Sequence, residues 1–266
     1  MLWRHVGRAR YGDCVSVTAF EITDASGQPP ADHHPIGIST GVFPNLRDDW
    51  LALVDEAAAV STFAVELSAL SSEELPGLLA YLRTDPAVAF RYVSVHAPAK
   101  NRGSNEVENV RQLDEIPLWV RSIVTHPDVL SDLGPYRALG TRLVLENMDS
   151  RKDDGRTVEE MDRFFDALPA AGLCLDVAHA HSIDPSMGLA HALLDRFRSR
   201  LRHVHLSSLS DGHHVTLSDE DEAGFAEVLD RCGDVPWILE ATPPERWTRQ
   251  LKASRLVASG ASALLG

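Results

Sequence analysis

One pattern repeats along the chain from about Ile36 onward and constrains the fold more than any other feature. A short run of β-branched residues and leucines ends in a polar residue, and a longer amphipathic stretch follows. Eight such runs occur, at residues 36–41, 63–67, 92–96, 122–126, 142–147, 173–179, 202–206 and 237–242. The polar ends of most successive runs are 29 to 35 residues apart, and one interval, from His126 to Glu146, is 20 residues. A strand followed by a helix needs about this length.

The stretches between the runs have the spacing of amphipathic helices. In residues 48–60, one predicted apolar face consists of Trp50, Leu51, Val54 and Ala58. Two sequences match capping boxes that precede helices, Ser71-x-x-Glu74 and Thr157-x-x-Glu160.

Two further helical stretches are predicted. Residues 219–231 place Phe225, Val228 and Leu229 at helical spacing. In residues 105–122, Pro117 is expected to divide a helix into two pieces, because proline cannot donate the backbone hydrogen bond of a helix interior.

Eight strands that alternate with helices predict an α/β fold, a single-domain (β/α)8 TIM barrel over residues 35–266. The chain of 266 residues has the length of one such barrel. Residues 1–34 lie outside the repeat and are read as a short N-terminal extension, with room for an extra strand or hairpin. An open doubly wound sheet is the rival fold, and the absence of G-x-G-x-x-G after any run disfavours it.

Composition narrows the partners and the compartment. The net charge of -14 repels phosphate backbones, which disfavours a nucleic-acid partner and favours a small-molecule substrate. No apolar run is long enough to span a membrane. Three widely spaced cysteines indicate a reducing cytoplasm. Twelve histidines are an unusually large number for a chain of this size. The sequence does not indicate the oligomeric state.

The polar residues that end the strands are suited to metal binding. In a βα barrel, functional residues lie where strands end, and strand alternation turns every second side chain inward. The inward-facing end residues on six consecutive strands are His96, His126, Glu146, Asp176, His205 and Glu240. All are nitrogen or oxygen donors that suit a divalent cation. His179 follows Asp176 by one helical turn, and either His213 or His214 can supply a further donor from a loop.

The motifs that hold these residues resemble those of the xylose isomerase-like TIM-barrel superfamily, which contains apurinic endonucleases and sugar isomerases and epimerases. The motifs are VHAP (95–98), THPD (125–128), LENMD (145–149), LDVAH (175–179), HVHLSS (203–208) and LEATPP (239–244). The resemblance covers roughly residues 36–245. It implies a common set of metal ligands at Glu146, Asp176, His205 and Glu240.

The apurinic-endonuclease branch implies additional metal ligands and a cluster of up to three ions. Its motifs match His96, His126 and His179, and its loop histidine falls on His214. In that alignment Gly212 stands where the branch has an aspartate. In the alternative alignment, with Asp211 and His213 at these positions, the spacing to the downstream residues is off by one, so two ions of three are expected more firmly than the third. The expected cofactors are therefore one to three divalent ions, with Zn, Mn and Fe as the candidates.

Two chemistries follow from these residues. The leading expectation is a metal-dependent hydrolase that cleaves a phosphoester in a small phosphorylated or polyhydroxylated substrate. The alternative is a sugar or sugar-phosphate isomerase or epimerase with one metal, in which Glu146 and Glu240 act as an acid–base pair and His179 binds a hydroxyl. A multinuclear iron oxidative enzyme and a non-catalytic ligand-binding barrel are the remaining alternatives. The expected substrate-binding residues are Glu66, Asn147, Arg151 and Lys152.

Overall fold

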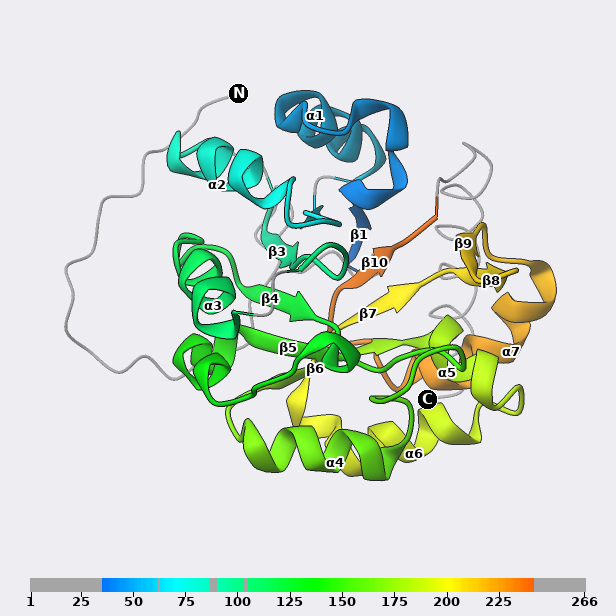
Figure 1. The fold of residues 1–266 in the computed structure, drawn as a ribbon. Helices are drawn as coiled ribbons and strands as arrows, with labels where there is room; N and C mark the ends of the chain where they lie inside the picture. Colours follow the sequence, from blue (N-terminus) through cyan, green and yellow to red (C-terminus); the bar gives the residue numbers. More distant parts are fainter. Residues whose placement is uncertain (1–34, 62, 87–89, 103–104, 242–266) are drawn as a thin grey trace, which may run out of the picture. The chain divides into compact units, whose positions relative to one another are not determined.

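The computed structural model describes residues 35–61, 63–86, 90–102 and 105–241 (Figure 1). Eight parallel strands close into a barrel in the spatial order β1-β10-β7-β6-β5-β4-β3-β2, which confirms the predicted fold class. The barrel strands are β1 (Ile36–Ser39), β2 (Ala64–Ser68), β3 (Tyr92–His96), β4 (Ser122–Thr125), β5 (Leu143–Glu146), β6 (Gly172–Asp176), β7 (Leu201–Leu206) and β10 (Trp237–Leu239). The predicted N-terminal extension, residues 1–34, lies outside the described residues.

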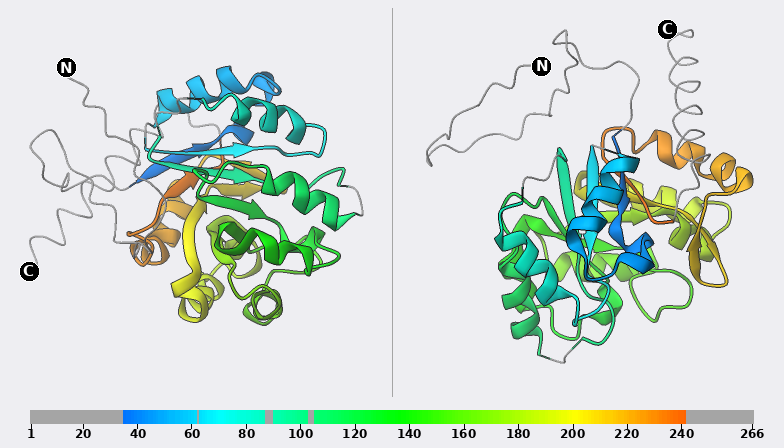
Figure 2. Two further views of the ribbon diagram at one scale, coloured as in Figure 1. Left: turned by 90° about the vertical axis from the view of Figure 1, so that its left-hand side faces the viewer. Right: turned by 90° about the horizontal axis from the view of Figure 1, so that it is seen from above.

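Seven α-helices in the described part of the chain lie around the outside of the barrel (Figures 1 and 2). They are α1 (Trp50–Val60), α2 (Leu75–Arg83), α3 (Glu106–Asp114), α4 (Val158–Ala167), α5 (Val177–Ile183), α6 (Gly188–Phe197) and α7 (Asp219–Asp230). Short 3-10 helices complete the connections, at η1 (Thr40–Val42), η2 (Pro44–Leu46), η3 (Pro127–Val129), η4 (Pro135–Arg142) and η5 (Arg198–Arg200). None of the helices described is long and apolar enough to cross a membrane.

The alternation predicted for the strands is present and separates two environments. Leu143 and Leu145 of β5 belong to the main hydrophobic core, with the helices. Val144 points to the other side, where it forms a small apolar cluster with Val124 and Cys174. Glu146 is two residues after Val144 and therefore has the same inward orientation at the end of the strand. The strand pattern thus directs the donor side chains into the mouth of the barrel.

Two details of the predicted helices are wrong. Leu51 is 64% exposed, whereas Leu53 and Ala57 are fully buried, so the apolar face of α1 is rotated from the predicted one. Helix α2 begins at Leu75, and its N-cap residue, Glu74, makes no capping hydrogen bond with its side chain. The Glu74 carboxylate instead binds Arg47, so the sequence around Ser71 is not a capping box.

Other predicted elements are confirmed or shortened. Thr157 caps α4 as expected, with its hydroxyl accepting a hydrogen bond from the backbone N–H of Glu160. Helix α7 has the predicted buried face. By contrast, α3 ends before Pro117 and no second helical piece follows in residues 115–121, so the prediction of two pieces is wrong.

Two of the connections that follow donor-bearing strands are not simple α-helices. Between β4 and β5, within the 20-residue interval, there are only 3-10 helices, and Gly140 adopts a positive φ of 56°. After β7 the chain forms a small antiparallel hairpin of β8 (Ser208–Ser210) and β9 (His213–Val215). The periodicity of the sequence did not predict this hairpin, which carries His214.

Candidate metal centre

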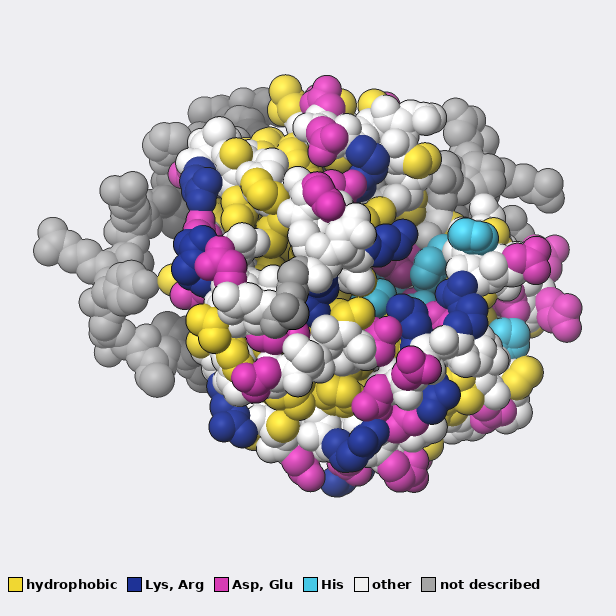
Figure 3. Space-filling view, viewed as in Figure 1, with side chains coloured by type: hydrophobic (Ala, Val, Ile, Leu, Met, Phe, Trp, Pro, Cys, Tyr) yellow, Lys and Arg dark blue, Asp and Glu magenta, His cyan; other side chains and the backbone are white. Residues whose placement is uncertain are grey.

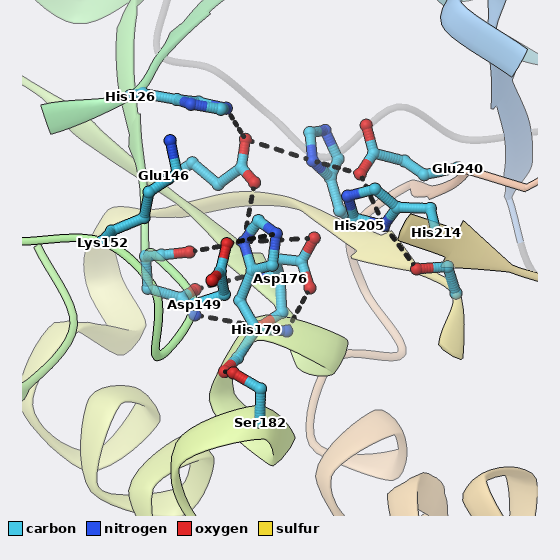
Figure 4. A network of polar contacts seen from close by, with 12 residues as sticks. His126, Glu146, Asp149, Lys152, Asp176, His179, Ser182, His205, His214 and Glu240 are labelled. Atoms are coloured by element: carbon cyan, nitrogen blue, oxygen red, sulfur yellow. Dashed lines mark hydrogen bonds and ion pairs between the residues drawn. The ribbon is translucent and has the colours of Figure 1, made fainter. Parts of the chain in front are cut away.

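The six predicted strand-end donors lie together at one end of the barrel, and Figure 4 labels all of them except His96. Because all barrel strands are parallel, their carboxyl ends meet at the same mouth. His96, Glu146 and Asp176 are the last residues of their strands. His126 and Glu240 directly follow their strands, and His205 is the penultimate residue of β7. The structure groups these donors, together with His179 and His214, into three adjacent sets.

The first set consists of two histidines and one glutamate. Nε2 of His96 lies 3.3 Å from Oε2 of Glu146, and Nε2 of His126 lies 3.5 Å from the same oxygen. The two Nε2 atoms are 3.1 Å apart. Nδ1 of His96 lies 2.9 Å from the backbone oxygen of Ala97 and can donate to it, which leaves Nε2 free to act as a ligand. The set can therefore present two imidazole nitrogens and one carboxylate oxygen to a single cation.

The second set is centred on His205. Its Nδ1 lies 3.4 Å from Oε2 of Glu146 and 3.4 Å from Oε2 of Glu240. The ligand atoms of these three residues and of Asp176 all lie within 4.8 Å of one another. This set contains three carboxylates and one imidazole, which is the combination implied by the superfamily motifs.

The third set contains Asp176, His179 and His214. Oδ1 of Asp176 accepts the backbone N–H of His179 at 2.7 Å, and this N-cap of α5 fixes His179 one helical turn beyond the strand. His214 reaches the set from β9, with its Nδ1 2.7 Å from the hydroxyl of Ser207. The neighbouring His213 lines the cavity described below but belongs to no donor set among the described residues.

Asn147 does not line the cavity, and its side chain instead holds the backbone of Asp176. Its side-chain amide accepts the backbone N–H of Asp176 at 2.8 Å and donates to the backbone oxygen of Asp176 at 2.9 Å. Both bonds connect the end of β5 to the end of β6, so Asn147 holds the carboxylate-bearing residue in place. It is fully buried.

Several buried polar atoms of the donor sets lack a hydrogen-bond partner, and a cation would supply one. Within the described part of the chain, Glu146 Oε2, Asp176 Oδ2 and His205 Nδ1 are buried and accept or donate no hydrogen bond. Buried polar atoms are normally satisfied, and an orphaned one needs an explanation. These atoms all face the interior of the donor sets, so a divalent cation fits them.

The proximity of these groups shifts their pKa values strongly. Burial lowers the pKa of His96, but the adjacent carboxylate of Glu146 outweighs burial and raises that pKa to about 9. Burial likewise opposes protonation of His179, yet the carboxylates of Asp176 and Glu146 raise its pKa to about 10. Burial raises the pKa of Glu240 above its usual range. The mouth therefore favours positive charge, whether as protons or as metal ions.

A cavity of about 560 Å³ opens above the donor sets. In the space-filling view, histidine, lysine and arginine side chains gather around a hollow with acidic side chains inside it (Figure 3). The basic residues that line the cavity are Lys100, Arg151 and Lys152. Its size and its mixture of cations with carboxylates suit a small anionic or hydroxylated molecule.

Two of these cations are paired with carboxylates. Arg151 binds Asp149 with its Nε at 2.8 Å, and Lys152 lies 3.1 Å from Asp128. The backbone of Gly212, at a φ of 76°, packs against the Arg151 guanidinium, which a Cβ at this position would overlap. The positive φ and the close approach both favour glycine at the position where the apurinic-endonuclease motif has an aspartate.

Glu66, the remaining predicted substrate residue, does not line the cavity. It is fully buried inside the barrel beneath His205. Its oxygens lie 3.2 and 3.3 Å from Nε2 of His205, and the hydroxyl of Ser94 donates to it at 2.9 Å. Despite burial, the charge of His205 and hydrogen bonds from His203 and His205 lower its pKa well below the usual range.

Asp149 is a site residue that the sequence reasoning missed. Its side chain is buried, both of its oxygens accept hydrogen bonds from Arg151, and one of them lies 3.9 Å from Nε2 of His179. Burial raises its pKa, but Arg151 and His179 outweigh this and lower it to about 2. Its place in the loop directly after a donor strand was the signal that could have identified it.

The fold and the donors define the class of this protein as a (β/α)8 barrel with a candidate metal centre at its mouth. Residues 124–255 match the family model described as the xylose isomerase-like TIM barrel, which confirms the resemblance predicted from the motifs. No curated protein shows a significant match to the sequence.

Similar solved structures include two endonucleases and an epimerase. Endonuclease IV from Thermus thermophilus is 20% identical with a TM-score of 0.54, over 87% of this chain and 100% of that chain. L-ribulose 3-epimerase is 14% identical with a TM-score of 0.56, over 88% of this chain and 98% of that chain. An AP endonuclease of family 2 from Brucella melitensis is 16% identical with a TM-score of 0.55, over 82% of this chain and 96% of that chain. At these identities the similarity shows the fold alone.

Proposed function

We propose that this protein is a divalent-metal-dependent hydrolase with a multinuclear centre, which cleaves a phosphoester in a small phosphorylated or polyhydroxylated substrate. One observation carries the proposal. The three donor sets share residues, since Glu146 belongs to the first and second sets and Asp176 to the second and third. Shared carboxylates are the usual means of holding two cations a few ångströms apart.

The residues have distinct roles in this proposal. His96 and His126 hold a cation with Glu146, and His205 and Glu240 hold the neighbouring one. His179 and His214 complete a third position with Asp176. Bound divalent cations would lower the pKa of a water molecule and neutralise charge on a leaving oxygen. Zn, Mn and Fe all accept this mixture of imidazole and carboxylate ligands.

Arg151 and Lys152 are proposed to bind the anionic part of the substrate. Both line the cavity, but each is paired with a carboxylate. A substrate phosphate would therefore compete with Asp149 and Asp128 for these cations. The guanidinium of Arg151 can donate two parallel hydrogen bonds to a phosphate. The cavity of about 560 Å³ and the net charge of -14 support a small molecule over a nucleic acid.

An isomerase or epimerase is the second candidate, and one observation favours it. Glu146 and Glu240 lie at equal distances of 3.4 Å from Nδ1 of His205. Two carboxylates around a single metal position are suited to removing a proton from one face of a carbon and returning it to the other. In this case His96 and His126 would not be needed as ligands.

The number of bound ions separates these candidates. Metal analysis of the purified protein, combined with anomalous scattering from crystals, is expected to give two or three ions per chain. His126→Ala is expected to lower that number by one, whereas His191→Ala, in α6 and outside the donor sets, is expected to leave it unchanged. A single ion that survives His126→Ala would favour the epimerase. Protein that binds no metal would support the ligand-binding barrel.

The compartment is proposed from the cysteines. Cys174 and Cys232 are buried free thiols, which is typical of proteins in a reducing environment. We therefore propose a cytoplasmic enzyme.

A further inference from the structure

A buried carboxylate below the donor sets has no role in the proposed chemistry. Glu66 lies in β2 with none of its surface exposed, on the inner side of the barrel. A buried charge is costly unless it is paired and hydrogen-bonded. Its partners are Ser94, whose hydroxyl donates to Oε2 at 2.9 Å, and His205, whose Nε2 is hydrogen-bonded to the same oxygen at 3.3 Å.

The contact between Glu66 and His205 decides which nitrogen of the imidazole carries hydrogen. An ionised carboxylate only accepts hydrogen bonds, so Nε2 of His205 must donate. In a neutral imidazole the other nitrogen, Nδ1, then has a free lone pair. Nδ1 faces the carboxylates of Glu146 and Glu240 at 3.4 Å each, so acceptor atoms face one another unless a proton or a metal cation lies among them.

A second set of contacts holds Glu66 from below. Nε2 of His203 lies 3.5 Å from Oε2 of Glu66. Nδ1 of the same ring lies 2.8 Å from the hydroxyl of Tyr92, which is also 2.8 Å from the hydroxyl of Ser122. These side chains come from three different strands, so the orientation of the carboxylate is set by the barrel itself.

We propose that Glu66 is a positioning residue, which fixes the ring and the tautomer of His205 so that Nδ1 is presented to a divalent cation. The inference rests on the proposed function, since it needs a metal at His205. This positioning role replaces the expectation from the sequence that Glu66 binds a substrate hydroxyl, because the Glu66 carboxylate is buried beneath His205. Partners of this kind typically contribute about 10- to 100-fold in metal affinity.

Two measurements on Glu66→Gln test this role. The substitution preserves size but replaces one accepting oxygen by a donating amide, so it cannot accept N–H groups on both sides. Calorimetric titration of the metal-free protein with Zn²⁺ is expected to show an affinity at the His205 position about 10- to 100-fold weaker than in wild type. Nitrogen NMR of histidine-labelled protein, in the zinc-bound form, is expected to show protonation at Nε2 of His205 in wild type and its loss or mixing in the variant.

Glu106→Gln is the matched control, because Glu106 is also a buried carboxylate with several hydrogen bonds, but lies in α3. It is expected to change neither the zinc affinity nor the His205 signal. Should Glu66→Gln fail to fold, Ser94→Ala loosens Glu66 while keeping its charge and is expected to weaken zinc binding several-fold. Wild-type affinity and tautomer in the folded variant would overturn the inference alone. A wild-type protein that binds no zinc would instead overturn the proposed function.

Discussion

At the scale of the residue, Glu146 has the most connected position in the donor sets. Its two oxygens lie within 3.5 Å of nitrogens from four histidines, His96, His126, His179 and His205. Burial raises its pKa, but the charges of His205 and His126 outweigh burial and lower it well below the usual range. It is therefore a charged candidate ligand at the centre of the site, and the hydrolase and the epimerase proposals both depend on it.

We expect Glu146→Gln to reduce turnover of any phosphoester that the wild-type protein hydrolyses by about 100-fold or more, since it removes a charge shared by two donor sets. The fold should persist, because the amide has the same size, and the far-UV circular dichroism spectrum should match that of wild type. Steady-state kinetics provide the measurement. The variant Glu108→Gln, at a half-buried carboxylate of α3 outside the donor sets, serves as control. Unchanged turnover in Glu146→Gln would remove this residue from the mechanism.

At the scale of the element, the helices differ in how well the sequence specifies their ends. Thr157 and Glu160 stand three residues apart at the start of α4, and both take part in the predicted capping. The same spacing at Ser71 and Glu74 forms no cap, because α2 begins only at Leu75 and the Glu74 carboxylate binds Arg47 and the backbone N–H of Leu70. A capping motif is local, but it caps a helix only where the fold starts one at the matching residue.

Loss of the α4 cap should lower stability by a modest amount. Thr157→Ala removes the hydroxyl that accepts the Glu160 backbone N–H, and a lost N-cap costs about 1 kcal/mol. Urea denaturation is expected to show this decrease in the free energy of unfolding, with metal binding unaltered. The equivalent substitution Ser71→Ala is expected to have a smaller effect, and an equal loss in both variants would contradict the capping argument.

At the scale of the whole molecule, a buried ionic network at Glu106 joins two connecting segments of the barrel. Its carboxylate accepts hydrogen bonds from Tyr136 at 2.7 Å, from the backbone N–H of Ser131 at 2.9 Å and from Arg102 at 2.8 Å. Burial raises the pKa of Glu106, but these bonds and the charge of Arg102 lower it to about 2. The network connects α3 to the segment between β4 and β5, which has no α-helix of its own.

The stability contributed by this network should depend on pH in one direction. A carboxyl group whose pKa is lower in the folded state stabilises the protein above its unfolded pKa. That contribution is therefore complete above about pH 5. It declines as the pH falls toward the folded pKa of about 2. The difference in unfolding free energy between wild type and Glu106→Gln is expected to be about 1–3 kcal/mol at pH 7 and to shrink below pH 4. A difference that is constant between pH 7 and pH 3 would contradict this assignment.

The sequence by itself determined the barrel and the identity of the strand-end donors. Both depend on local regularities, namely the alternation of side chains along a strand and the length of one strand–helix unit. Val144 and Glu146 share a face in any such strand, whatever lies beside it. The strand ends at His96 and Asp176 could therefore be recognised as donors before any neighbour was known.

Only the tertiary structure decided how these residues combine. Closure and strand register bring Glu66 of β2 against His205 of β7, which are 139 residues apart in the chain. Tertiary packing also pairs Lys152 with Asp128, and the hairpin brings His214 to Asp176 and His179. The physical reason is that distances across a closed barrel depend on all eight strands at once, whereas a sequence pattern reports only the geometry of each strand.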